Sequence, residues 1–139
     1  MTHATCKQAA DQVEQFWRAL GGRVVRLDPE RHDRLVALVS HLPHMAAVGV
    51  LLLAAESGED YDLLAALLGN GFRDSTRVAE GPPEIWRDIC LENREPIADN
   101  LELLGEQSFA LAEEIRMGES DRLLDHLRRA RELRKRLVP

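Results

Sequence analysis

Apolar residues recur at intervals of three and four along nearly the whole chain, and this periodicity constrains the fold more than any other feature. The first apolar stripe consists of Val13, Phe16, Trp17 and Leu20. It stops at Gly21-Gly22, a common way to end a helix. Only residues 23–27 are extended in character, as a connector or a lone edge strand. We therefore expect an all-α bundle of about five to six helices.

A proline interrupts the most apolar helix of the predicted bundle. Asp28 and Pro29 supply an N-cap and a first helical residue. Further on, Pro43 cannot donate a hydrogen bond to the carbonyl of Val39, so the helix should kink or restart there. Residues 45–55 are apolar on every side, which predicts a central, buried helix. That run is too short to span a bilayer, so we expect no membrane contact.

The stretch beyond Pro96 has the pattern of a helix that packs lengthwise on another helix. Its seam positions alternate in steps of four and three: Ile97, Leu101, Leu104, Ser108, Leu111 and Ile115. One straight helix from Pro82 to Met117 would be about 50 Å long, whereas a globule of this chain length is about 37 Å across. Either the chain folds back at Pro96 or the helix lies along a second subunit. We favour a homodimer with long helices packed across its two-fold axis.

Composition limits the kinds of partner that the chain can bind and indicates the cellular compartment in which we expect it. The chain has 139 residues, enough for one domain over 1–139. Its net charge of −6 and aromatic content of 4% argue against nucleic-acid binding, so the arginine-rich last helix is interpreted as a solvated face. Cys6 and Cys90 are far apart and are interpreted as free thiols. The N-terminus lacks the pattern of a secretory signal, and we expect a cytoplasmic protein.

Two polar motifs stand out from the apolar background. His41 and His44 flank a proline, and a buried imidazole needs a hydrogen-bond partner even when neutral. The block 71–77 adds two arginines and an aspartate. Together these residues suggest a site for a small anion, polar at its centre and apolar at its walls. Each has a plainer interpretation, as a core histidine or a surface ion pair, and Arg73 and Arg87 are interpreted as solvated.

A metal site is the other interpretation of the histidines. His32 and Asp33 with His41 and His44 offer ligand types that suit zinc, manganese or iron. However, His32 and His41 are nine residues apart and would project to opposite sides of one regular helix. The remaining ligands of such a site are not evident. We therefore expect no metal.

An ordered set of motifs resembles a known family over nearly the whole chain. The motifs are His32-Asp33, Ser40-His41-Leu42-Pro43-His44, the block 71–77, the block 83–89 and Asn93. They resemble the C-terminal helical domain of prephenate and arogenate dehydrogenases, NAD(P)-dependent oxidoreductases of tyrosine biosynthesis, a branch of aromatic amino acid biosynthesis. In that family an N-terminal Rossmann domain binds the dinucleotide, and the helical domain forms the dimer and much of the substrate pocket.

The resemblance implies only the second half of such an enzyme. The chain shows no GxGxxG after a strand and no βαβ pattern, and it lacks the histidine that serves the family as catalytic base. We therefore expect the N-terminal Rossmann domain to be absent, as in a separated domain, a truncated relative or one piece of a split enzyme. NAD or NADP is expected in the complete enzyme and no cofactor for this chain alone.

The family reaction is an oxidative decarboxylation, in which a hydride leaves the ring carbon that bears the 4-hydroxyl and the ring carboxylate departs as carbon dioxide. Its substrate is a dicarboxylate, which suits the planar fork of arginine. No catalytic residue is expected in this chain. The resemblance implies that Arg77 clamps a carboxylate, that Asp74 orients Arg77, and that His44 donates a hydrogen bond to the substrate. It also implies that His41 supports the pocket wall, that Trp86 lies against the substrate ring, and that Asp33 joins a polar network near the dimer seam.

Two hypotheses of function remain open on the sequence alone. The first is the dimerisation and substrate-binding domain of a prephenate or arogenate dehydrogenase, with a separate Rossmann domain as a partner. The second is a stand-alone, non-catalytic module that binds prephenate, arogenate or tyrosine, or that scaffolds a partner chain. Whether the chain is itself an enzyme stays undecided at this point.

Overall fold

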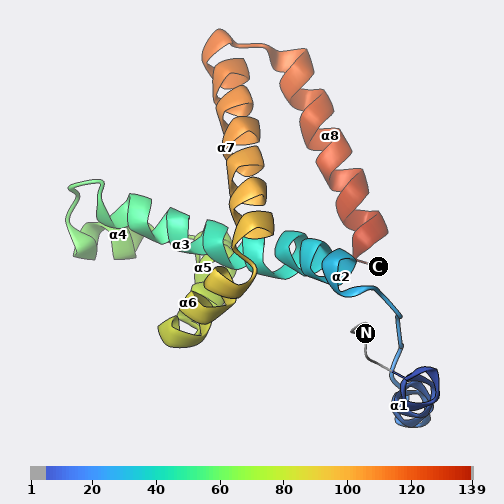
Figure 1. Ribbon diagram of the computed structural model, residues 1–139. Coiled ribbons are helices and arrows are strands. Elements are labelled where there is room, and N and C mark those ends of the chain that lie inside the picture. The colour runs from blue at the N-terminus through green and yellow to red at the C-terminus, as the bar shows by residue number, and fades with distance from the viewer. Residues whose placement is uncertain (1–5, 139) are drawn as a thin grey trace. The chain divides into compact units, whose positions relative to one another are not determined.

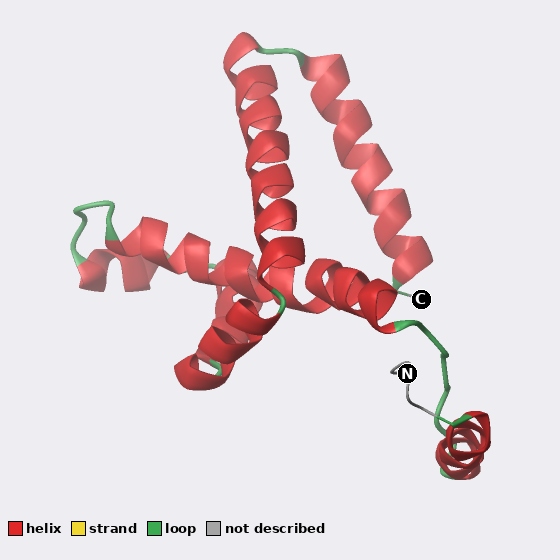
Figure 2. Cartoon of the chain, viewed as in Figure 1, coloured by secondary structure: helices red, strands yellow, loops and turns green. Residues whose placement is uncertain are grey.

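The chain folds entirely into helices and connectors in the part that the structure describes. A computed structural model describes residues 6–138 (Figure 1), and no strand is present among them (Figure 2). The predicted all-α class is confirmed. The α-helices are α1 (Lys7–Ala19), α2 (Pro29–Val36), α3 (Leu42–Ala55), α4 (Tyr61–Leu67), α5 (Asn70–Thr76), α6 (Pro83–Glu92), α7 (Arg94–Met117) and α8 (Ser120–Leu137).

Two further helical turns complete the list, a π-helical turn η1 (Ala37–His41) and a 3₁₀ turn η2 (Arg77–Glu80). The helices outnumber the five or six expected because residues 61–80 form two short helices and the 3₁₀ turn. Internal contacts divide the chain into two units, one ending at Asn100 and the other starting at Leu101. Each unit is described by itself below.

Helix α1 ends where its sequence predicts, in a glycine motif. The N–H of Gly22 donates to the carbonyl of Trp17 over 2.9 Å, and the N–H of Gly21 donates to the carbonyl of Arg18 over 3.0 Å. Gly21 has a φ of 81°, in the left-handed region that glycine adopts without strain. The extended residues 23–27 follow as a connector rather than a strand.

Helices α2 and α3 form one helical run through the π-helical turn. The side chain of Asp28 accepts a hydrogen bond from the N–H of Arg31 over 2.9 Å and caps the start, as predicted. At the interruption, the N–H of Leu42 donates to the carbonyl of Ala37, five residues earlier. Because Pro43 has no N–H to give to the carbonyl of Val39, the chain passes it with a wider turn instead of a break.

The predicted full burial of residues 45–55 is wrong for the chain on its own. Leu52 and Leu53 are 56% and 72% exposed. The only buried apolar residues of the described chain are Ala37, Ala47 and Ile97. Helix α3 contacts α5 and η2 and meets α6 through His44, yet these elements leave Leu52 and Leu53 exposed. A helix that is apolar all round therefore keeps an uncovered face.

By length and composition alone, the run Pro29–Ala55 would also be able to cross a bilayer. It has 27 residues, and its most apolar window has a mean hydropathy of 1.9. A core helix of a soluble protein passes the same test. This run carries a π-helical turn and two histidines in contact with α6 or its C-terminal end, which is the behaviour of a helix that packs against protein.

The predicted interruption at Pro96 lies three residues earlier. The chain turns at Asn93, between α6 and α7, where φ is −117° and ψ is 36°. Pro96 is the third residue of α7, in the first turn, where a helix needs no N–H donor. Residues 82–117 are therefore two helices rather than one long one.

The second unit holds the rest of α7 and the whole of α8. The seam positions Leu104, Leu111 and Ile115 are exposed, so nothing in the described chain covers the heptad seam there. Among the described residues, a polar side-chain contact links the two helices, in which Nδ1 of His126 lies 3.0 Å from the carboxylate of Glu114. Glu114 is buried, whereas the side chain of His126 is about half exposed.

Candidate functional site

The centre of the candidate site is a stacked pair of rings from α3 and α6. The imidazole of His44 lies on the indole of Trp86, with ring centroids 3.4 Å apart and planes at 10°. His44 is only 4% exposed, and its Nδ1 has no hydrogen-bond partner. A buried polar atom without a partner costs free energy. This nitrogen therefore has a hydrogen-bonding capacity that no described residue uses.

Gly81 lets the turn before α6 approach the ring pair. A Cβ at this position would lie 2.4 Å from Nε1 of Trp86 and 3.5 Å from Cε1 of His44. Real Cβ atoms do not come so close to a ring atom. The absence of a side chain here thus holds the indole in its stacked position.

A cavity of about 400 Å³ opens beside the stacked rings. Four of its lining residues lie on one face of α6, at positions i, i+3, i+4 and i+7. The lining residues are His44, Met45, Val48, Ala79, Gly81, Pro83, Trp86, Arg87 and Cys90. Its wall is mostly apolar and includes one histidine and one arginine. This is the kind of site that holds an apolar ring carrying a negative group.

His41 is placed on the same indole by a second set of contacts. Its ring meets Trp86 edge-on, with centroids 6.1 Å apart and planes at 88°. The amide nitrogen of Asn93 lies 3.3 Å from Nδ1 of His41 and donates to the main-chain carbonyl of Asp33 over 2.9 Å. Asn93 therefore ties the turn between α6 and α7 to the helical run that carries both histidines.

Burial lowers the pKa of both imidazoles below the ordinary value of 6.5. For His41 the negative charge of Asp33 opposes this effect, and for His44 the nearby main chain of Val78 does so. Both rings are therefore neutral at pH 7. A neutral imidazole offers one donor and one acceptor rather than a positive charge, so the charge that an anion needs must come from arginine.

The structure brings together His44, Trp86 and His41, as expected, but not all of the predicted site residues. Arg77 begins η2, is exposed and does not line the cavity. Asp74 is also exposed and makes no ion pair with Arg77 within the described residues. That Asp74 orients Arg77 stays a prediction, and the N–H of Arg77 donates to the carbonyl of Arg73, so the helical turn that carries Asp74 continues to Arg77.

Asp33 joins the polar network through its main chain rather than its side chain. Its carbonyl accepts the hydrogen bond from Asn93, while its carboxylate lies 2.9 Å from Nδ1 of His32. Both of these side chains are more than half exposed. Nowhere in residues 6–138 are three or more histidine, cysteine, aspartate or glutamate side chains grouped so as to hold a metal ion.

Arg87 lines the cavity, although the sequence predicted that it would be solvated. Its side chain lines the cavity, and its guanidinium pairs with the carboxylate of Asp88 at 2.7 Å and 2.8 Å. The sequence could have predicted this position, because four residues have the spacing of one helix face: Pro83, Trp86, Arg87 and Cys90. Arg87 therefore shares the face of Trp86.

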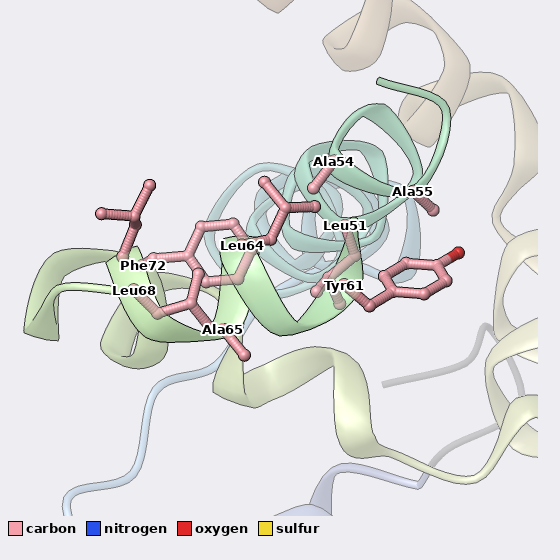
Figure 3. A pocket seen from close by; sticks show the side chains of 9 residues that line it. Leu51, Ala54, Ala55, Tyr61, Leu64, Ala65, Leu68 and Phe72 are labelled. Atoms are coloured by element: carbon pink, nitrogen blue, oxygen red, sulfur yellow. The ribbon is translucent and has the colours of Figure 1, made fainter. Parts of the chain in front are cut away.

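A second, larger cavity of about 570 Å³ lies between α3, α4 and α5 (Figure 3). It is lined by Leu51, Ala54, Ala55, Tyr61, Leu64, Ala65, Leu67, Leu68 and Phe72. None of these side chains is charged, and the Tyr61 hydroxyl is the one polar side-chain group among them. A site without cationic groups does not suit a dicarboxylate. We regard it as part of the uncovered apolar face of α3.

Comparison with known proteins identifies the family of this fold. Residues 28–129 match the model of the family described as "Prephenate dehydrogenase, dimerization domain". The chain is 31% identical over 131 residues to the cyclohexadienyl dehydrogenase of Zymomonas mobilis, covering 94% of this chain and 45% of that protein. It is 35% identical over 98 residues to the prephenate dehydrogenase of Bacillus subtilis, covering 70% of this chain and 26% of that protein.

Solved structures agree with the sequence relatives. The crystal structure of prephenate dehydrogenase from A. aeolicus in complex with hydroxyphenyl propionate and NAD+ has a TM-score of 0.87 and 33% identity, covering 99% of this chain and 48% of that chain. Synechocystis arogenate dehydrogenase has a TM-score of 0.84 and 26% identity, covering 98% of this chain and 50% of that chain.

The chain thus has the all-α fold of a dimerization domain. Its candidate site is a mostly apolar cavity lined also by His44 and Arg87. The chain belongs to the prephenate dehydrogenase family, and the resemblance inferred from its motifs is confirmed. It spans between about a quarter and a half of the length of these relatives.

Proposed function

We propose that this chain is the dimerisation and substrate-binding domain of a prephenate or arogenate dehydrogenase. The observation that carries the proposal is the cavity beside the stacked His44 and Trp86, with a buried, unpartnered ring nitrogen and an arginine at an apolar wall. A cyclic diacid needs such a combination of flat apolar surface, neutral hydrogen-bonding group and cation. The family of the chain is named for a reaction of such a diacid.

In this proposal the substrate ring lies against the apolar wall next to Trp86, and His44 hydrogen-bonds to a polar group of the substrate. Arg77 and Arg87 share the two carboxylates. Arg87 is already at the cavity. Arg77 adjoins Val78, whose main chain lies near His44, and its exposed side chain makes no ion pair in the described chain. It is therefore free to turn toward a bound carboxylate.

The chemistry of the reaction requires a second domain. NAD or NADP would supply the hydride acceptor, but the described residues contain no βαβ unit of the kind that holds a dinucleotide. The cofactor and the catalytic base then belong to a Rossmann domain, fused or separate. The residues of this domain bind the substrate, fix its orientation and keep water from one side of its ring.

The same proposal accounts for the uncovered apolar surfaces. The end of α3 and the seam of α7 expose many leucine and isoleucine side chains, and a soluble monomer rarely leaves large contiguous apolar surface uncovered. A second copy of the chain covers these surfaces in a homodimer. Its two cysteines are free thiols, which agrees with the reducing cytoplasm where we place the protein.

Calorimetric titration of the whole chain with prephenate, arogenate and tyrosine tests the proposal. We expect one of the two diacids to bind, and binding to weaken by at least tenfold in Arg77→Ala because a charged hydrogen bond is lost. Arg73→Ala, an exposed arginine on α5 that does not line the cavity, is the matched control. No heat with any ligand would contradict substrate binding and leave a scaffold of two chains.

A further inference from the structure

Two sulfur atoms meet at the wall of the cavity beside the stacked rings. Sγ of Cys90 on α6 lies 3.6 Å from Sδ of Met45 on α3. Both residues are partly buried, and both line the cavity. A thiol is a weak donor and a thioether is a weak acceptor, so the contact contributes little as a hydrogen bond. The contact therefore brings together two soft donor atoms whose lone pairs it hardly uses.

The distance between the two sulfurs suits a metal ion that is held by both of them. Metal–sulfur bonds in proteins are about 2.3 Å long. If an ion lies at that distance from both sulfurs, which are 3.6 Å apart, the angle between its two bonds is about 100°, close to the tetrahedral value. The side chains of Cys90 and Met45 therefore need little rearrangement to bind an ion between them.

The imidazole of His44 supplies a third donor at the same wall. His44 precedes Met45 on α3 and stacks on Trp86, which lies one helical turn before Cys90 on α6. Two neighbouring residues of α3 thus contact two residues that are one turn apart on α6. His44 lines the same cavity, and its buried Nδ1 has no hydrogen-bond partner. One unpartnered ring nitrogen and two sulfurs therefore belong to one wall of the cavity.

The types of donor decide which ion this wall suits. Thiolate and thioether ligands select soft ions such as Cu(I), whereas magnesium, calcium and manganese prefer carboxylate oxygens. None of the described residues that line this cavity is acidic. Zinc sites are built from cysteine, histidine and carboxylate ligands rather than from thioethers. The group differs from the histidine, cysteine and carboxylate clusters considered above, because one of its three ligands is a methionine.

We propose that Cys90, Met45 and His44 form a binding site for Cu(I). On binding, the Cys90 thiol gives its proton to water and the thiolate bonds to the ion, while Sδ of Met45 and Nδ1 of His44 each donate a lone pair. The ion keeps its oxidation state, and one proton leaves for each ion bound. A bound ion occupies space in the cavity that a substrate needs, so the two compete. The inference goes beyond the proposed function and does not depend on it.

Anaerobic titration of the whole chain with Cu(I), in competition with a coloured Cu(I) chelator, tests the inference. The starting protein carries Cys6→Ser, because Cys90 is then the one remaining cysteine. We expect one ion to bind per chain and one proton to be released per ion, measured with a pH indicator in weak buffer. X-ray absorption of the copper should show metal–sulfur bonds of about 2.3 Å.

Variants of the two sulfur ligands separate a metal site from simple packing. Cys90→Ser should weaken Cu(I) binding by more than about a hundredfold, because losing even a group that only supports a metal ligand costs about 10–100-fold. Met45→Leu keeps the size of the side chain, so the fold should tolerate it, but removing the thioether should weaken binding by about tenfold or more. Met117→Leu is its matched control and should leave binding unchanged, because Met117 is exposed on α7 and does not line the cavity.

Three results would overturn the inference. They are equal Cu(I) affinity of Met45→Leu and Met117→Leu, one ion shared between two chains, and tighter binding of Zn(II) than of Cu(I). The first of these would show that Cys90 and Met45 meet only through packing. None of these results bears on the titration with prephenate in the absence of metal, which decides the proposed function separately.

Discussion

The imidazole of His44 lies flat against the indole of Trp86, and this contact joins the helical run of α2 and α3 to α6. The stack leaves Nδ1 of His44 buried without a partner and opens a cavity beside it. One contact thus both stabilises the first unit and forms the wall of the candidate site. Changes near this pair should alter stability and ligand binding together.

Gly81→Ala should displace the indole and destabilise the protein. The new Cβ would meet Nε1 of Trp86 at 2.4 Å, and the rigid ring must move away. We expect a loss of about 1–3 kcal/mol in the free energy of unfolding, measured in urea, and weaker binding of the diacid. Gly71→Ala, in the first turn of α5, meets no atom within 4 Å and should not destabilise the protein, because alanine favours a helix over glycine. Equal effects of the two would contradict the stacked geometry.

Stability should fall as the pH is lowered below about 6.5. Burial lowers the pKa of His41 and His44 in the folded chain, so the unfolded chain binds protons there first. The stabilising effect is complete above the unfolded pKa and is lost as the pH drops toward the folded values. His44→Phe keeps a stacked ring without a titrating group and should flatten the profile between pH 7 and 5. An unchanged profile in this variant would refute the assignment.

Asn93→Ala should loosen the turn between α6 and α7. The variant loses the hydrogen bond to the carbonyl of Asp33 and the contact with His41, and should cost about 1–2 kcal/mol in urea unfolding. Asn100→Ala is a suitable comparison, because the amide of Asn100 bonds only to Pro96, one turn earlier in the same helix. A cost as small as that of Asn100→Ala would show that Asn93 does not hold the two segments together.

Arg87→Ala should weaken binding of prephenate or arogenate, although its effect on the fold should be small. The side chain is mostly exposed and pairs with Asp88 at the surface, and such pairs contribute little to stability. At the cavity it supplies the positive charge that the two neutral histidines do not. We expect about a tenfold rise in the dissociation constant by calorimetry. Unaltered affinity would leave Arg77 as the one arginine for both carboxylates.

The contact between Glu114 and His126 should respond unequally to removal of its two partners. His126→Leu leaves the buried carboxylate of Glu114 without its hydrogen bond, and we expect a cost of about 2–3 kcal/mol. Glu114→Leu instead leaves a half-exposed imidazole that water can reach, so its cost should be smaller. Unfolding in urea compares the two, and the reverse order would contradict the buried position of Glu114.

The sequence by itself determined the local structure of this protein. Asp28 and Pro29 start a helix, the glycines at 21 and 22 end one, and the three- and four-residue periodicity defines an all-α fold. These features act over a single turn of backbone, so neighbouring residues are sufficient to specify them. The motif with His41 and His44 likewise marked the part of the chain where the cavity lies.

Only the tertiary structure decided which side chains meet. It placed Arg87 rather than Arg77 at the cavity and left much of α3 uncovered. Both outcomes depend on where the chain changes direction, at the π-helical turn before Pro43 and at Asn93. A shift of one residue in such a turn rotates the following helix by about 100°. Helical periodicity therefore specifies each face, but not the neighbour that the face contacts.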